Sequence, residues 1–290
     1  ASCAGGSVSA VGGRVLGGES VDIVSMRVAR VDPAAIPTLR ANPAVRAVER
    51  DHVIRIQDGA TGNETTDTGG AASQSVPWGV GRINATRAAQ SVPAANRANV
   101  DVAVVDTGID YDHPDLEGSV EWGYDTTDEV GTAGVRAADD DNRHGTHVAG
   151  TIAASDNDRG VVGVAPGVDL YSMKALNADG YGYYSWWAEA LDRAVKGPDG
   201  EIGTEDDADV ISISAGGDER STTLRNAVEN AGEHSVIVAA AGNDGDGDPT
   251  TDEVSYPAAY PEVMGVAATD RDDRTTRTSA EGPDIATAAH

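Results

Sequence analysis

The segment Val100-Asp-Val-Ala-Val-Val-Asp106-Thr-Gly108 predicts a buried strand that ends on an acid at a tight turn. Beyond this segment, apolar runs that predict strands alternate with amphipathic segments that predict helices. The other predicted strands span 168–175, 210–213, 236–240 and 263–268, and the predicted helices span 144–155, 184–195 and 221–231. Alternation of this kind is typical of a parallel sheet covered by helices. The sequence therefore predicts an α/β fold for this part of the chain.

Three polar residues follow the ends of predicted strands: Asp106, Ser214 and Asn243. In open α/β sheets the chemistry gathers at the carboxyl ends of the strands. We therefore expect these side chains at one edge of the sheet.

The charge divides the chain into two units. Residues 1–57 hold seven arginines and five acids, which gives +2, whereas residues 58–290 sum to −29. The first unit reads as a small α+β domain, with a strand over 21–31, a helix from Asp32-Pro33 to Arg40, and further strands around Val45, Val48 and 53–56. Residues 58–72 lack apolar periodicity and predict an exposed linker that holds a processing region. The acidic unit spans 73–290.

The composition excludes some functions. The net charge is −27, with two lysines and no phenylalanine. Sequence-independent binding of nucleic acid needs a basic surface, so nucleic acid is not an expected partner. Abundant acid with scarce lysine resembles proteins of salt-loving organisms, and an ordinary acidic protein is the alternative. The single cysteine, Cys3, excludes an intrachain disulfide, and no apolar run reaches the roughly 18 residues of a membrane span.

Three segments carry candidate chemistry. Val104-Val-Asp106-Thr-Gly-Ile-Asp110 places an acid at a strand end, Asn142-Arg-His144-Gly-Thr-His-Val-Ala-Gly150 begins a helix with a histidine, and Ala239-Ala-Ala-Gly242-Asn243-Asp-Gly245 ends a strand with an amide. A histidine oriented by an acid can shuttle a proton, and an amide can donate to a developing oxyanion. These are three of the four parts of serine-type acyl transfer.

From about Gln74 to Thr278, the chain resembles the subtilisin-like serine proteases, of the haloarchaeal, halolysin-like type. The resemblance implies a three-layer fold in which Asp106 orients, His144 acts as general base and then acid, and Asn243 lines the oxyanion hole. The next histidine, His147, is expected to be a buried structural residue.

The resemblance also implies a groove for a polypeptide substrate. Leu176, Gly180 and Gly182 belong to the segment that would pair with the substrate backbone, and the opposing strand is Ser214-Ala215-Gly216. The walls of the first side-chain pocket would be formed by Ser214-Ala215-Gly216 together with Ala240, Ala241 and Gly242. Tyr184 and Trp186 either border an outer pocket or pack in the core.

Calcium is the implied ion. Its side-chain ligands would include Gln74, Asp115 and Asn157, with carbonyls from Ser155, Arg159 and Val161, and hard oxygen donors of this kind suit Ca²⁺. The alternative is a polar surface turn. The acid clusters at 139–141, 199–207 and 244–248 are expected to be solvated loops, and further ion sites are the alternative.

The N-terminal unit resembles the inhibitory propeptide of these proteases, mainly through 36–52, which implies a ferredoxin-like fold. We expect it to assist folding and to lie in the active site until it is cut within 57–73. The resemblance predicts a secreted, calcium-dependent, monomeric endopeptidase made as a zymogen, although residues 1–290 begin without a signal peptide.

One part of the family pattern is missing, because no Gly-Thr-Ser-Met-Ala segment with the nucleophile occurs in the sequence. We expect either a chain truncated before the serine or a catalytically dead, peptide-binding relative. A Gly-Thr-Ser segment encoded beyond His290 would distinguish the two.

Overall fold

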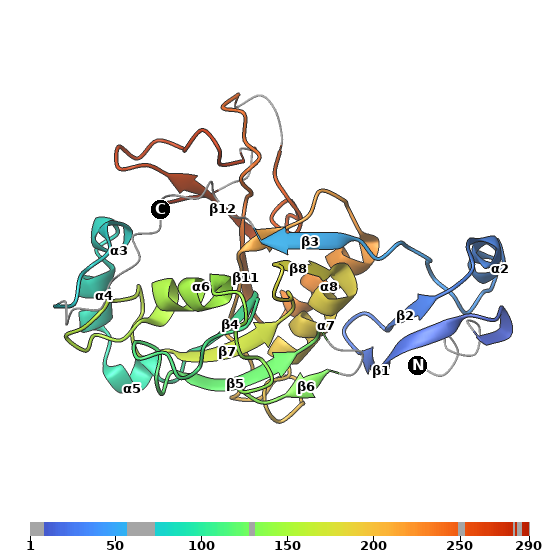
Figure 1. Ribbon diagram of the computed structural model, residues 1–290, viewed down its shortest axis with the longest axis horizontal. Helices are drawn as coiled ribbons and strands as arrows, with labels where there is room; N and C mark the ends of the chain where they lie inside the picture. The colour runs from blue at the N-terminus through green and yellow to red at the C-terminus, as the bar shows by residue number, and fades with distance from the viewer. Residues whose placement is uncertain are drawn as a thin grey trace.

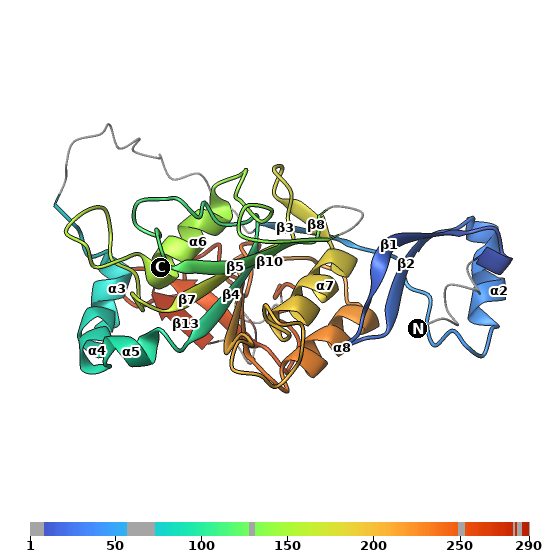
Figure 2. The ribbon, with the colours of Figure 1, turned by 90° about the horizontal axis from the view of Figure 1, so that it is seen from below.

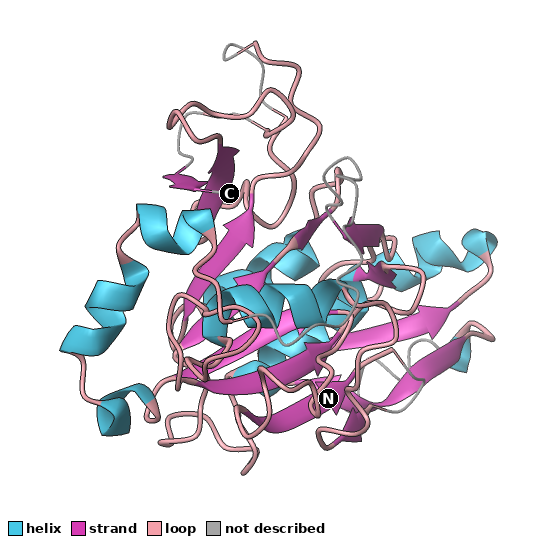
Figure 3. Cartoon of the chain, turned by 60° about the vertical axis from the view of Figure 1, so that its left-hand side comes forward, coloured by secondary structure: helices cyan, strands magenta, loops and turns pink. Residues whose placement is uncertain are grey.

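The computed structural model describes residues 9–56, 73–127, 131–248, 253–280, 282 and 286–289. Its main sheet has the strand order β13-β12-β11-β9-β4-β7-β5-β6. Figure 3 shows strands in magenta and helices in cyan. Seven of these strands run parallel, and β6 pairs antiparallel with β5 at one edge. The strands are β4 (Asp101–Asp106), β5 (Val120–Asp125), β6 (Thr132–Ala133), β7 (Asp169–Lys174), β9 (Val210–Ile213), β11 (Val236–Ala240), β12 (Met264–Thr269) and β13 (Ala286–Ala289).

Helices cover both faces of this sheet. On β4, Val102 and Val104 pack with α6 (His144–Ala153), while Ala103 and Val105 belong to the cluster that includes α7 (Tyr184–Ala194) and α8 (Thr222–Ala231). Successive side chains of a strand point to opposite faces, so β4 is buried on both sides. The helices α7 and α8 lie side by side (Figures 1 and 2). The predicted α/β fold with a mostly parallel sheet is confirmed.

Every strand and helix named above for the acidic unit is present, with its ends shifted by no more than two residues. Ser221 is the N-cap of α8, because its Oγ accepts a hydrogen bond from Leu224 N at 3.1 Å. The sequence analysis missed β5, β6 and β13. It also missed the short helices α3 (Trp78–Arg82), α4 (Ala85–Ser91) and α5 (Ala94–Arg97).

The N-terminal unit differs from its prediction in two places. Its elements are the antiparallel pair β1 (Arg14–Val21) and β2 (Met26–Arg30), the 3₁₀ turn η1 (Pro33–Ala35), α2 (Ile36–Arg40) and β3 (Val53–Ile56). The continuous strand predicted over 21–31 is wrong, because the chain turns at 22–25 with Ser25 at φ 50°. The strands predicted around Val45 and Val48 are also wrong, since both residues lie in a loop.

The helical prediction for this unit is confirmed. Asp32 caps η1, with its Oδ1 accepting from Ala34 N at 2.8 Å, and α2 ends at Arg40. The ferredoxin-like arrangement stays a prediction, and the linker 58–72 lies outside the described residues.

Strand β3 leaves the N-terminal unit and joins the acidic one. It lies between β8 (Tyr181–Tyr183) and β10 (Ala215–Gly216), antiparallel to both. Figure 1 shows β3 extending from the N-terminal elements across the molecule to β8. Within the described residues, no helix is both long and apolar enough to cross a membrane.

Candidate active site

Asp106 and His144 meet at the carboxyl edge of the sheet. Asp106 is the last residue of β4 and is fully buried, and His144 is the first residue of α6. Asp106 Oδ1 lies 2.7 Å from His144 Nδ1 and also accepts from Thr107 N at 2.7 Å. A carboxylate in this position fixes the imidazole tautomer and stabilises the imidazolium form.

A glycine permits this approach of helix and strand. A Cβ on Gly145 would lie 2.1 Å from Gly108 O, so a larger residue at the second position of α6 would push the helix away from the turn after β4. The same face of α6 buries Ala149 and Ala153. His147 is exposed on the helix, so the expectation of a buried histidine there is wrong.

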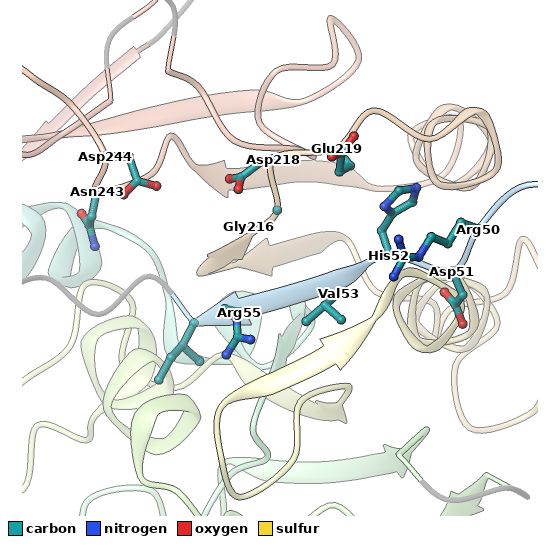
Figure 4. Close-up of a pocket in the computed structure, with 12 residues that line it drawn as sticks. Arg50, Asp51, His52, Val53, Arg55, Gly216, Asp218, Glu219, Asn243 and Asp244 are labelled. Atoms are coloured by element: carbon teal, nitrogen blue, oxygen red, sulfur yellow. The ribbon is translucent and has the colours of Figure 1, made fainter.

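Asn243 lies beyond the end of β11, at a turn where Gly242 has φ 121°. It lines a cavity of about 600 Å³ together with Ile56, Gly216 and Asp244. Figure 4 shows Asn243 and Asp244 at one end of this pocket and Arg50, Asp51 and His52 at the other. The side-chain amide of Asn243 thus lies beside the groove that β3 occupies.

The predicted groove residues fall into three groups. Four of them contact β3 directly: Ala215 pairs with Ile56, Gly216 with Arg55, Gly182 with Ile54, and Gly180 O accepts from Ile56 N at 2.9 Å. Leu176 is buried in the main core cluster with Ile54. Four predicted residues are not among those that line the cavity, although each lies within three residues of a lining residue in the chain: Ser214, Ala240, Ala241 and Gly242.

Glycine is required at the groove edge. A Cβ on Gly182 would lie 2.1 Å from Ala175 O, and Gly180 has φ 72°. Of the two alternatives for Tyr184, the structure shows core packing. Its ring is buried in the core, yet it lies 5.7 Å from the His52 ring, and its hydroxyl donates to Glu219 O at 2.6 Å. Trp186 is half-buried and packs edge-on against Tyr183.

Two acids of the N-terminal unit bind the first turns of α7 and α8. Asp51 accepts from Ser185 N at 3.0 Å and from Ser185 Oγ at 2.7 Å. Glu49 accepts from Thr222 N at 3.2 Å, from Thr223 N at 3.0 Å and from the hydroxyls of Ser221 and Thr223. Free N–H groups and the helix dipole make such helix ends favourable for carboxylates. The sequence analysis did not assign these two acids.

The turn at 22–25 makes a second contact with the acidic unit. It bonds to Asp192 in α7 and to Lys196 just after this helix. Asp192 Oδ1 accepts from Asp22 N at 3.1 Å and from Ile23 N at 3.0 Å. Lys196 Nζ donates to Asp192 at 2.9 Å and to Asp22 at 2.8 Å. These bonds explain why the chain turns here instead of continuing as a strand, because the backbone groups bond to a helix side chain 170 residues away.

The attachment through Glu49 should depend on pH. Burial alone would raise the pKa of Glu49, but hydrogen bonds from Thr223, Thr222 and Ser221 hold that pKa below the ordinary 4.5. A lowered pKa means that the contribution of Glu49 to stability is present above pH 4.5 and is lost as the pH falls through the lowered value. We expect Glu49→Gln to lower Tm at pH 7, and the difference from wild type to shrink as the pH falls below 4.5 and through the lowered pKa. Exposed Glu117→Gln is the control, and a Tm difference independent of pH would contradict the assignment.

The residues proposed for calcium also come together. Gln74 Nε2 lies 2.6 Å from Ser155 O and 3.2 Å from Val161 O. Asp115 is buried, and its carboxylate accepts from Asn157 Nδ2 at 3.3 Å and from Val161 N at 3.1 Å. Arg159 N donates to Asn157 Oδ1 at 3.1 Å.

This donor set is one carboxylate with amide and carbonyl oxygens, which fits a hard cation and not a thiolate- or imidazole-binding metal. No group of three or more His, Cys, Asp or Glu that could hold a metal occurs among the described residues.

A carboxylate–imidazole pair at the carboxyl edge of a parallel sheet, with a strand-binding groove and an amide beside it, is the architecture of a serine-type hydrolase. Residues 97–289 match the Subtilase family, Peptidase_S8. The chain belongs to this family, as the sequence motifs indicate.

Relatives extend the match. Subtilisin E of Bacillus subtilis is 34% identical over 281 residues, which cover 96% of this chain and 64% of that protein. An intracellular serine protease of Paenibacillus polymyxa is 46% identical over 170 residues, 58% of this chain and 49% of the relative. A subtilisin of Bacillus pumilus is 38% identical over 216 residues, 73% of this chain and 71% of the relative. The chain thus spans slightly less than two thirds of subtilisin E.

Proposed function

We propose that this chain is the precursor of a secreted, calcium-dependent, salt-adapted serine endopeptidase, inhibited by its own N-terminal unit. The observation that carries the proposal is the 2.7 Å contact between Asp106 and His144 beside a groove that already holds a peptide strand, β3. An N-terminal segment that fills the groove suits a protease that must stay inactive where it is made.

The proposed reaction is acyl transfer to a serine that is not among the 290 residues. The substrate lies as a strand between β8 and β10. The serine hydroxyl gives its proton to His144 as its oxygen bonds to the carbonyl carbon, and Asp106 stabilises the imidazolium. Asn243 donates to the oxyanion, the C–N bond breaks, and His144 returns the proton to the leaving amine. Water then hydrolyses the acyl-enzyme by the same steps.

Replacement of Asn243 by alanine tests the role of the amide. In the active endopeptidase of this proposal, we expect Asn243→Ala to lower kcat by about 10²–10³, with KM little changed, because the hydrogen bond strengthens only in the transition state. The assay is hydrolysis of a chromogenic peptide, and Asp246→Asn, in the same exposed loop, is the control. An equal loss in kcat for both variants would show that the loop matters and the amide does not.

A catalytically dead, peptide-binding protein is the second candidate, and the observation that favours it is the absence of a Gly-Thr-Ser segment from the 290 residues. The two candidates differ in one measurement, which is to read the gene past the codon for His290 in all three frames. A Gly-Thr-Ser segment supports the endopeptidase, and a stop without one supports the binding protein.

The calcium of the proposal would be held by Asp115, Asn157 and Gln74, with carbonyls of Ser155, Arg159 and Val161. Its chemistry there would be to neutralise the carboxylate and to tie the loop after α6 to the segment at Gln74. It would take no part in bond breaking.

Salt adaptation is supported by the acidic composition, with a net charge of −27. Both lysines, Lys174 and Lys196, are buried and bonded to carboxylates. Self-repulsion loosens such a chain at low salt, and salt of about 1 M shortens the screening length to about 3 Å. We expect Tm to rise continuously from about 0.1 M to about 3 M KCl. A Tm that stays flat or falls across this range would contradict salt adaptation.

A further inference from the structure

Two threonines flank the catalytic pair and tie its segments together. Thr107 follows Asp106, and its Oγ1 accepts from Gly145 N, in α6, at 2.9 Å. Thr146 lies two residues after His144, and its Oγ1 accepts from Asp110 N, in the turn after β4, at 3.0 Å. Each hydroxyl thus takes an N–H from the segment that carries the other catalytic residue.

Both hydroxyls give their protons to one carboxylate. Asp140 Oδ1 accepts from Thr107 Oγ1 at 2.8 Å, and Asp140 Oδ2 accepts from Thr146 Oγ1 at 2.5 Å. The same carboxylate accepts from the backbone N–H groups of Asn142, Arg143 and Thr146 at 2.9–3.0 Å, just before and within the first turn of α6. The expectation that 139–141 is a solvated acidic loop is therefore wrong for Asp140.

We propose that Asp140 is a positioning residue, which holds His144 against Asp106 by orienting the hydroxyls of Thr107 and Thr146. This inference rests on the proposed function, since it assigns a role to the pair that the function uses. Asp140 acts through the two threonines and does not need to touch a substrate.

The charge on Asp140 is what gives the hydroxyls their direction. An ionised carboxylate can only accept, so each threonine must donate to it and keep its lone pairs for the N–H of the opposite segment. Burial alone would raise the pKa of Asp140, but hydrogen bonds from Thr146, Arg143 and Asn142 hold that pKa below its usual value, so the carboxylate is ionised wherever the protein is folded near neutral pH. The neutral amide of an Asp140→Asn variant would present N–H groups to one of the two hydroxyls. It would therefore break at least one of the hydrogen bonds that the threonine hydroxyls donate to Asp140.

The neighbouring acid supplies a matched control. Asp141 is exposed, and its Oδ1 accepts from Lys174 Nζ at 2.6 Å, outside the two threonine ties. Asp141→Asn removes the same charge one residue away and weakens the hold on Lys174, whose Nζ also donates to Thr107 O at 2.5 Å, but it leaves the bonds between Asp140 and the two threonine hydroxyls in place.

The test is an NMR measurement on the full 290-residue chain in molar KCl. The signal is the low-field Nδ1–H proton of His144, identified by its absence in His144→Gln. Its exchange with water slows when the imidazole is held against the Asp106 carboxylate. We expect Asp140→Asn and Thr107→Val to speed this exchange by about tenfold or more, and Asp141→Asn and Thr107→Ser to leave it near wild type.

Equal exchange in Asp140→Asn and Asp141→Asn, or wild-type exchange in Thr107→Val, would overturn the proposal. If circular dichroism shows that Asp140→Asn does not fold, the Thr107→Val and Thr107→Ser pair decides the matter, because both variants keep the carboxylate. The measurement needs neither a substrate nor a serine, so it stands apart from any failure of the proposed function.

Discussion

Ile54→Ala is expected to open the groove by releasing β3. The Ile54 side chain has no exposed surface and packs in the core cluster that includes Leu176, Tyr184 and Trp187. Truncating a buried isoleucine to alanine costs about 2–5 kcal/mol, which corresponds to about 30- to 5000-fold in the opening equilibrium. We expect a rise of this size in hydrogen exchange at the Ile56 amide, which donates to Gly180 O in wild type.

The adjacent residue provides the control. Val53 belongs to the same strand but is 42% exposed, because successive side chains point to opposite sides. Val53→Ala should change exchange by less than about threefold, which is within the range of ordinary surface substitutions. Similar exchange in both variants would mean that backbone pairing alone holds β3, and that the groove has no side-chain pocket at this position.

The same alternation bears on the choice of substrate. If the substrate of the proposed function binds as β3 does, it buries one side chain at the position of Ile54 and exposes the next. Arg55, the following residue, lies over the Tyr181 ring at 5.9 Å and lines a pocket with the acids Asp218, Glu219 and Asp244. Basic side chains are therefore compatible with the exposed positions of the groove.

Local pattern predicted the parts of the site that depend on local sequence. Asp106 and Asn243 follow buried strands, so strand periodicity sufficed to predict that they lie at one edge of the sheet, whereas the pairing of His144 with Asp106 was predicted from the family resemblance. The family resemblance added the groove segments around Gly182 and Gly216, which the structure places on either side of β3.

Contacts between distant segments could not be predicted in this way. Asp22 and Asp192, or Glu49 and Thr223, are separated by more than 160 residues, and neither member carries a local signal for the other. The turn at 22–25 was missed for the same reason, since its backbone bonds to α7. Asp140 looked like one acid in a solvated run, and only the folded arrangement shows the donors that surround it.

Removal of calcium is the second large effect that we expect. A site that binds only the folded chain adds about 4 kcal/mol when the free ion is at a thousand times its Kd. For a domain of this size, that corresponds to a Tm change of about 10 °C. We expect EGTA to lower Tm by this amount, Ca²⁺ to restore it, and Mg²⁺ to restore little, because Mg²⁺ gives up its water less readily than Ca²⁺.

Two aspartates separate a specific site from a general effect of divalent ions on an acidic surface. Asp115 is buried among the proposed ligands, whereas Asp156 is exposed in the same loop. Asp115→Asn should abolish the dependence of Tm on Ca²⁺, and Asp156→Asn should preserve it, although both remove one negative charge. If both variants keep the dependence, the ion binds elsewhere. If both lose part of it equally, the effect is screening of the acidic surface, and the hydrogen bonds between Gln74 and Ser155 and between Asn157 and Asp115 are then a polar turn that needs no metal.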